Sequence, residues 1–363
     1  MSTHVFALLK NAVSDQAFPG AALAVGSSSG LSYTLCHGHH EYACTRRVRA
    51  DHLFDLASLT KVVSSTSLAM RLHDTGHLDL DARVIDLLPA FLEGMDGSPE
   101  RAQVTIRHLL AHCSGLPAGR RFDLGAPVSA PERLDTVCKS PLRCAPGTET
   151  VYSDIGAIVL GALLEQIGDA PLDALFEREV CAPLGLTRTL FRPTSIPLAE
   201  IVPTECSAAR EGRAWHGDVH DENARWLGGV AGHAGLFSTA LDLARFCQDL
   251  LTCRLGGTGR LASAETARLF THRAELVAES SRCLGWDSPS SGCSGGHLLG
   301  AHSFGHTGFT GTSLWLDPDA DLYVVLLTNA VHPRRERRRH GFFAWRRRIH
   351  TAVYKARGYG SAR

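Results

Sequence analysis

The sequence has no hydrophobic run long enough to span a membrane. A membrane-spanning helix needs about 20 predominantly apolar residues, and the longest uncharged apolar stretches, at 157–164 and 323–327, have only the length of core segments. An excess of one charge is also lacking, because 37 basic residues balance 37 acidic ones. The 363 residues are 44% hydrophobic and 20% charged, which is typical of a globular protein and excludes a wholly disordered or fibrous chain. We therefore expect a globular protein with no membrane span.

Cysteines with metal-binding spacing are absent as well. The eleven cysteines are an odd number and include no C-x-x-C, so no zinc site is expected. His108 and His112 are four residues apart on an expected helix, but the glutamate of H-E-x-x-H is missing, and we interpret both as structural. The first residues lack the basic segment and the long apolar segment of a secretory signal. Free thiols without an export signal predict a cytoplasmic location.

Basic residues are concentrated near the C-terminal end. From residue 334 to residue 363 the chain has eleven Lys or Arg and a single Glu. Such a block is typical of a solvated surface helix with a basic loop before it, or of a tail that binds an anionic partner such as nucleic acid or a lipid surface. No aromatic residue interleaves the arginines at 334–339, as a base-stacking surface requires. Nucleic acid is therefore not expected as a partner.

The order of helices and strands predicts the fold class. Apolar periodicity indicates, in chain order, a helix at 5–13, a hairpin at 21–36, a helix at 58–73, several helices between 79 and 255, strands at 312–316 and 321–328, and a helix at 342–354. This order favours an α/β (α+β) fold, in which an antiparallel sheet is flanked by terminal helices and a mostly helical domain is inserted. We expect the sheet domain at 1–78 and 256–363, the helical domain at 79–255, and the active site at their interface.

Ser58-Leu59-Thr60-Lys61 begins the helix expected at 58–73. Residues three apart on a helix are neighbours, so the Ser58 hydroxyl and the Lys61 amine lie on one face. A serine hydroxyl is a good nucleophile only when a neighbouring base takes its proton. A lysine can do so only when uncharged, and lowering its pKa from 10.4 to about 7 takes roughly 4.6 kcal/mol. Burial and a helix N-terminus both act in that direction, so the motif predicts a sheltered cleft at a helix start.

Two later segments carry groups that suit the same chemistry. Tyr152 precedes an apolar helix, where its hydroxyl can relay a proton between the serine, the lysine and a leaving group, while Asp154 can hold Lys61. The glycine-rich segment 304–311 comes just before a predicted strand. Glycines let the backbone approach a ligand closely. An N–H from this edge, together with the N–H of Ser58, would form a two-donor oxyanion hole.

These motifs, in this order, resemble those of the serine β-lactamase and penicillin-binding protein superfamily. They are S-x-x-K at 58–61, Y-x-N/D at 152–154 and K/H-T-G at 306–308, with landmarks similar to the class-C-like branch at 77–81, 105–117 and 235–244. The resemblance covers almost the whole chain. It implies an antiparallel sheet flanked by helices beside a helical domain. It also implies hydrolysis of amides or esters through an acyl-enzyme, with no metal and no organic cofactor.

The resemblance further implies a role for each matching residue. Ser58 is then the acylated nucleophile, and Lys61 and Tyr152 form the acid/base pair. His306, Thr307 and Gly308 lie on the strand beside the site, and the N–H of Phe309 completes the oxyanion hole.

Two residues depart from the β-lactamase pattern. Asp154 stands where this branch of β-lactamases usually has Asn, and an acid there stabilises the Lys61 ammonium unless it points elsewhere or Tyr152 acts as the base. His306 replaces a lysine that helps to bind the substrate carboxylate, and a histidine with a pKa near 6.5 is only about a quarter charged at pH 7. Both departures resemble peptidase-like, amidase-like and esterase-like members better than true β-lactamases.

Acids and imidazoles also gather at 216–235, around a glycine-rich loop. Among them, His220 and His233 either hydrogen-bond a polar substrate at the rim of the cleft or only support the loop. The sequence leaves both interpretations open.

We therefore expect a serine hydrolase of small-molecule amides or esters, with a peptidoglycan fragment (a muropeptide) as the favoured substrate. The alternatives are a promiscuous carboxylesterase, a β-lactamase, and a non-catalytic penicilloyl-type sensor that is acylated without turnover. His306 and the absent export signal disfavour the β-lactamase. The occupied catalytic positions and the missing membrane segment disfavour the sensor. The sequence does not decide the oligomeric state.

Overall fold

The computed structural model describes residues 2–94, 97–125, 128–339 and 341–359. The strands are β1 (Gly20–Ser27), β2 (Gly30–Gly38), β3 (Phe54–Asp55), β4 (Leu190–Phe191), β5 (Leu236–Ser238), β6 (Phe304–Thr307), β7 (Ser313–Asp317) and β8 (Leu322–Thr328). The α-helices are α1 (Ser2–Ser14), α2 (Ser67–Asp74), α3 (Val84–Leu87), α4 (Ile106–Leu110), α5 (Ala130–Cys138), α6 (Asp154–Gly168), α7 (Leu172–Phe176), α8 (Ala182–Leu184), α9 (Glu222–Trp226), α10 (Ala240–Arg254), α11 (Ala264–Thr271) and α12 (Phe342–Ala356). Two π-helices, η1 (Lys61–Thr66) and η4 (Glu177–Cys181), and the 3₁₀ turns η2 (Pro89–Glu93), η3 (Pro99–Gln103), η5 (Leu198–Glu200), η6 (Ala208–Arg210) and η7 (Arg335–Arg339) complete the helical elements.

Strands from both ends of the chain form one antiparallel sheet in the order β2-β1-β8-β7-β6. The N-terminal hairpin joins the C-terminal strands through β1 and β8, with Ala21 opposite Thr328. The strands β1, β7 and β8 are buried along their whole length, which explains their continuous apolar sequences. The strand β6 lies at the edge, where Thr307 pairs with Ser313 of β7.

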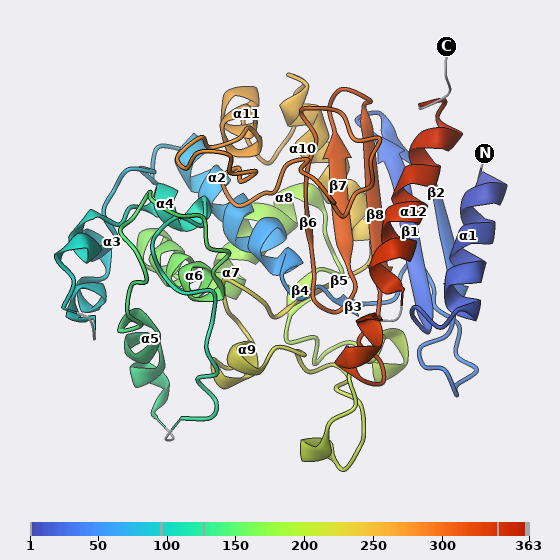
Figure 1. Cartoon of the computed structure of the whole chain (residues 1–363), viewed down its shortest axis with the longest axis horizontal. Helices are drawn as coiled ribbons and strands as arrows, with labels where there is room; N and C mark the ends of the chain where they lie inside the picture. Colours follow the sequence, from blue (N-terminus) through green and yellow to red (C-terminus); the bar gives the residue numbers. More distant parts are fainter. Residues whose placement is uncertain (1, 95–96, 126–127, 340, 360–363) are drawn as a thin grey trace.

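Helices cover both faces of this sheet. On one face, α1 and α12 lie side by side near the two termini (Figure 1), and their apolar residues share a core with β1 and β8. On the other face, α10 packs against β1 and β8. The predicted antiparallel sheet flanked by terminal helices is therefore confirmed.

The remaining helices gather beside the sheet, where α3 to α7 lie on the side away from the termini (Figure 1). A small sheet in the order β3-β5-β4 joins the two regions. The helix α10 belongs to the range 79–255 assigned to the inserted domain, although it packs on the large sheet. The domain boundaries themselves stay a prediction.

No single helix in the described part of the chain has the length and apolar composition to cross a membrane. The segments Asp154–Gly168 and Leu172–Leu184 reach that composition only as a pair bent by 72°. Residues 155–164 of the first segment are all buried in the protein core.

Candidate active site

The backbone that leads into Ser58 is held by a buried carboxylate. The Asp55 side chain accepts hydrogen bonds from the N–H of Ala57 at 2.8 Å and from the N–H of His220 at 2.6 Å, while its own carbonyl accepts the Thr310 hydroxyl at 2.7 Å. Burial raises the pKa of Asp55. Ala57 is left-handed, with φ of 47°, a conformation that costs a residue with a Cβ about 1–2 kcal/mol. The turn before Ser58 is thus strained and locked in place.

Lys61 lies behind the Ser58 hydroxyl with only 3% of its side chain exposed. Its Nζ donates to Ser58 Oγ at 3.0 Å, to Asp154 Oδ1 at 2.7 Å and to the His233 carbonyl at 3.1 Å. All three ammonium protons therefore have acceptors. Asp154 begins α6 with its carboxylate pointing at the lysine.

The charge of Lys61 is a correction to the sequence argument, which required an uncharged amine. Burial alone would lower the pKa of Lys61, but the Asp154 carboxylate and the neighbouring Tyr152 outweigh it and raise that pKa above its ordinary value. The sequence analysis expected an acid at position 154 to oppose the use of Lys61 as a base. The Asp154 carboxylate does point at the amine. Lys61 is therefore an ammonium at neutral pH, so that it cannot take the serine proton.

Tyr152 lies between two imidazoles and two cations. Its ring centroid is 4.7 Å from that of His112 and 5.7 Å from that of His306, and it is 5.0 Å from Lys61 Nζ and 5.1 Å from the Arg282 guanidinium. The Tyr152 ring therefore lies close to both positive charges at the site.

Arg282 is a site residue that the sequence reasoning missed, and His112, interpreted there as structural, lies beside Tyr152. His112 accepts the Val151 N–H on its carbonyl at 2.8 Å and the Ser153 N–H on Nδ1 at 3.2 Å, so it fixes the backbone on both sides of Tyr152. Its position inside the family landmark at 105–117 was a signal that could have found it. Arg282 follows no motif, and only the folded chain brings it to the site.

His306 is uncharged at neutral pH, whereas the sequence predicted about a quarter of the charge. Burial lowers its pKa well below the ordinary value, and the positive charges of Arg282 and Lys61 lower it further. The Nδ1–H donates to the Thr307 carbonyl at 2.9 Å. A neutral, internally bonded imidazole cannot replace the carboxylate-binding lysine.

Ser58 and Tyr152 open into a cavity of about 370 Å³. Thr307, Gly308 and Phe309 line its β6 side, as the family resemblance implied. Within the described residues, the backbone N–H groups of Ser58 and Phe309 donate to no other protein atom. Both are therefore available to an oxyanion. A side chain at Gly308 would overlap the Leu56 carbonyl, so this position requires glycine.

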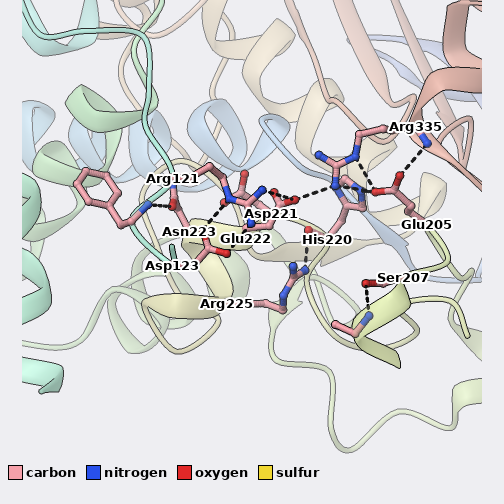
Figure 2. A network of polar contacts seen from close by, with 12 residues as sticks. Arg121, Asp123, Glu205, Ser207, His220, Asp221, Glu222, Asn223, Arg225 and Arg335 are labelled. Atoms are coloured by element: carbon pink, nitrogen blue, oxygen red, sulfur yellow. Dashed lines mark hydrogen bonds and ion pairs between the residues drawn. The ribbon is translucent and has the colours of Figure 1, made fainter. Parts of the chain in front are cut away.

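Figure 2 shows a network of polar contacts around Glu205, His220 and Arg335. The Glu205 carboxylate lies between Arg335, whose Nε donates at 2.7 Å, and His220, whose Nε2 is at 2.9 Å. Burial would raise the pKa of Glu205, but the bonds with His220 and Arg335 lower it to about 2. The His220 ring stacks on Phe309 with 5.7 Å between centroids. Through Glu222, the network continues to Arg121 and Asp123.

The imidazoles of His220 and His233 are buried and do not line the cavity. His233 Nε2 bonds to Asp221 Oδ1 at 2.8 Å, and the His233 carbonyl accepts Lys61. Of the two interpretations that the sequence left open, the geometry favours support. The His233 carbonyl positions Lys61, and the His220 ring packs against Phe309.

The antiparallel sheet, with Ser58 and Lys61 beside a cavity that residues 306–309 line, has the arrangement of the β-lactamase and transpeptidase fold. The family model described as Beta-lactamase matches residues 5–346. The chain belongs to this family and is a hydrolase of the serine β-lactamase-related kind.

Two curated relatives are similar over most of the chain. The "N-acetylmuramyl-L-alanine amidase" of Bacillus subtilis (strain 168) is 32% identical over 345 residues, 87% of this chain and 78% of the relative. The "Putative D-alanyl-D-alanine carboxypeptidase" of Escherichia coli (strain K12) is 32% identical over 304 residues, 77% of this chain and 69% of the relative.

Solved structures show the same fold. The hydrolase EstCE1, described as having promiscuous acyltransferase activity, has a TM-score of 0.77 and 25% identity, with 97% of this chain and 98% of that one covered. A penicillin-binding protein homologue from Pyrococcus abyssi has a TM-score of 0.74 at 18% identity, with 98% of this chain and 77% of that one covered, and it supports the fold alone.

Proposed function

We propose that this protein is a serine hydrolase that cleaves an amide bond in a peptidoglycan fragment through an acyl-enzyme on Ser58. The observation that carries the proposal is the hydrogen bond of 3.0 Å between Lys61 Nζ and Ser58 Oγ at the cavity that Tyr152 lines. The names of the two relatives, an amidase and a carboxypeptidase, both denote cleavage of amide bonds in peptidoglycan material. Their shared chemistry supports the same substrate class here.

Acylation begins with Tyr152 as the base, because Lys61 is already protonated. The step uses Tyr152 in its deprotonated form: the phenolate takes the proton of Ser58, and Oγ bonds to the substrate carbonyl carbon. The carbonyl electron pair moves to oxygen, where the N–H groups of Ser58 and Phe309 stabilise it; losing one such donor typically costs about 2.7–4 kcal/mol. The C–N bond then breaks, and the tyrosine hydroxyl gives its proton to the leaving amine.

Deacylation repeats these steps with water. The regenerated Tyr152 phenolate takes a proton from water, whose oxygen attacks the acyl carbon. Collapse of the intermediate breaks the bond to Oγ, and the tyrosine returns the proton to Ser58. Throughout the cycle, Lys61 stays charged and stabilises negative charge on Ser58 Oγ and on the Tyr152 oxygen. Asp154 and the His233 carbonyl hold its Nζ in place.

The experiment compares four substrates with the wild type and with Ser58→Ala. N-Acetylmuramyl-L-alanine tests for amidase activity, and a peptide ending in D-alanyl-D-alanine tests for carboxypeptidase activity. p-Nitrophenyl acetate tests for esterase activity, and nitrocefin tests for β-lactamase activity. We expect release of L-alanine or D-alanine with a higher kcat/KM than for nitrocefin, and no release by the variant. Equal activity of Ser58→Ala would disprove the mechanism. An acyl adduct without turnover on any substrate would instead identify a sensor.

A carboxylesterase is the second candidate, because the neutral His306 offers no charge to a substrate carboxylate. EstCE1, with which the chain shares 25% identity and the whole fold, supports this alternative. Turnover of p-nitrophenyl acetate with no release of alanine from either peptidoglycan substrate would favour it.

The cytoplasmic location remains part of the proposal. It is supported by the cysteines, all eleven of which lie within the described residues and are free thiols, as expected in a reducing compartment. Fractionation of cells that express the protein tests the location.

A further inference from the structure

A second cavity, of about 780 Å³, lies between α1, α12 and the loop 290–297. Residues 344, 347, 348, 351, 352 and 355 of α12 line it, and their spacing of three and four places them on one face of the helix. Figure 1 shows α1 and α12 side by side, and neither Ser58 nor Tyr152 lines this cavity. The cavity is therefore distinct from the one at Ser58, although the two share the loop residues 290–293.

The charges that line this cavity are all of one sign. They belong to Arg347, Arg348 and Lys355 of α12, and no Asp or Glu lines the cavity. His4 of α1 and His297 of the loop also line it. Among the described residues, none of the three cations forms an ion pair. Arginines elsewhere, such as Arg83 with Asp86, commonly have a carboxylate within hydrogen-bond distance. The unpaired cations leave a positive potential that favours an anion.

Apolar residues also line the cavity. They include Leu8, Ala344 and Ala352, so the cavity offers both a hydrophobic surface and several N–H donors. Arginine forks bind phosphate and carboxylate oxygens in pairs. The loop wall at 290–293 is shared with the cavity at Ser58, and Arg347 donates to the Gly292 carbonyl in that wall at 3.4 Å.

We propose that this second cavity is a binding site for a single-chain amphiphile with an anionic phosphate or carboxylate head. The head lies between Arg347, Arg348 and Lys355, and the chain covers Leu8 and the α12 alanines. The three cations line one cavity rather than an open surface. The site therefore takes one molecule of the amphiphile per chain.

Isothermal titration calorimetry of the full chain tests the site with decyl phosphate and decanoate, below their critical micelle concentrations. Decyl maltoside supplies the same chain with a neutral head, and inorganic phosphate supplies the head alone. The variant R347Q/R348Q removes two cations of the cavity. The control K10Q/R334Q removes two cations whose side chains do not line it, with the same change in net charge.

We expect saturable binding of one anionic amphiphile per chain, weakened about tenfold or more in R347Q/R348Q and unchanged in K10Q/R334Q. Co-sedimentation with phosphatidylglycerol vesicles that is lost in R347Q/R348Q would assign the ligand to a lipid, and binding of the monomeric amphiphile alone would assign it to a free metabolite. No saturable binding of either anionic probe would overturn the proposal. Equal affinity for decyl maltoside, or equal affinity of the two double variants, would also overturn it.

Discussion

The charge of Lys61 determines which residue can act as the base. Three acceptors surround its Nζ, and one of them is the carboxylate of Asp154 at 2.7 Å. The pair raises the pKa of Lys61 and so opposes its use as a neutral base. The proposed mechanism therefore uses Tyr152 to move protons and Lys61 as a fixed positive charge beside Ser58.

Replacing Asp154 by Asn separates the two possible roles of the lysine. The substitution removes the main cause that raises the pKa of Lys61 and leaves burial, which lowers it. If the ammonium is needed, activity should be lost as the pH rises and Lys61 loses its proton. In D154N this loss should begin at a lower pH than in the wild type. We therefore expect the alkaline limb of the kcat/KM profile to move down by one pH unit or more. A higher rate at pH 7 in D154N would show that the neutral amine is the base.

Strand β6 depends on a close approach to the segment that carries the nucleophile. The Gly308 N–H donates to the Thr312 carbonyl at 2.8 Å, and a Cβ at Gly308 would overlap both the Leu56 carbonyl and the Thr312 hydroxyl. Gly308→Ala should lower the free energy of unfolding by about 1–3 kcal/mol, as overpacking generally does, and should reduce kcat strongly. Urea denaturation and esterase assays measure both effects. Gly125→Ala, which meets only the Phe122 carbonyl at 3.3 Å, is the control, and equal behaviour of the two variants would contradict the prediction.

The network around Glu205 joins η7 to the loop that backs Phe309. Glu205 has a pKa of about 2 in the folded protein, below the ordinary 4.5. Its contribution to stability is therefore complete above pH 4.5 and is lost as the pH falls towards 2. E205Q should be less stable than the wild type by up to about 3 kcal/mol at pH 7, and the difference should narrow at pH 3.5. Chemical denaturation at both pH values measures it, and a constant difference would contradict the assignment.

Long helices and strands with regularly spaced apolar residues were predictable from the sequence, whereas short elements were not. The hairpin β1–β2, the strands β7 and β8 and the helix α12 match their expected ranges within a few residues. The strands of the β3-β5-β4 sheet have two or three residues each, which is too short for an alternating pattern. They exist because the chain around Ser58 pairs with a segment far away in the sequence.

The assembled molecule explains what the sequence could not show about the site. The spacing at 58–61 predicted the contact between Ser58 and Lys61, because residues three apart at the start of a helix are neighbours. The charge of the lysine depends on Asp154, 93 residues away, and Arg282 reaches Tyr152 from a loop without a motif. The same holds for His220 and His233, whose burial is decided by tertiary packing. The sequence therefore identifies these side chains, but their charge and burial depend on neighbours that only the folded chain brings together.

The cysteines give a prediction for the whole molecule. All eleven are free, and burial raises the pKa of several of the deeply buried thiols, Cys113 to about 11 among them. Denatured protein should react with eleven equivalents of Ellman's reagent whether or not it was first treated with a reductant. Native protein should react with fewer, because buried, protonated thiols are unreactive. A lower count in unreduced, denatured protein would reveal a disulfide that the fold does not contain.

The most direct test of the proposed mechanism is covalent labelling of Ser58. The protein is incubated with a fluorophosphonate, and intact-mass and peptide mass spectrometry locate the adduct in the wild type, S58A and K61A. The mechanism predicts one adduct on Ser58, none in S58A, and labelling slowed by orders of magnitude in K61A, because the serine alkoxide then lacks its neighbouring ammonium. A label on another residue, or equal labelling rates in K61A and the wild type, would contradict it.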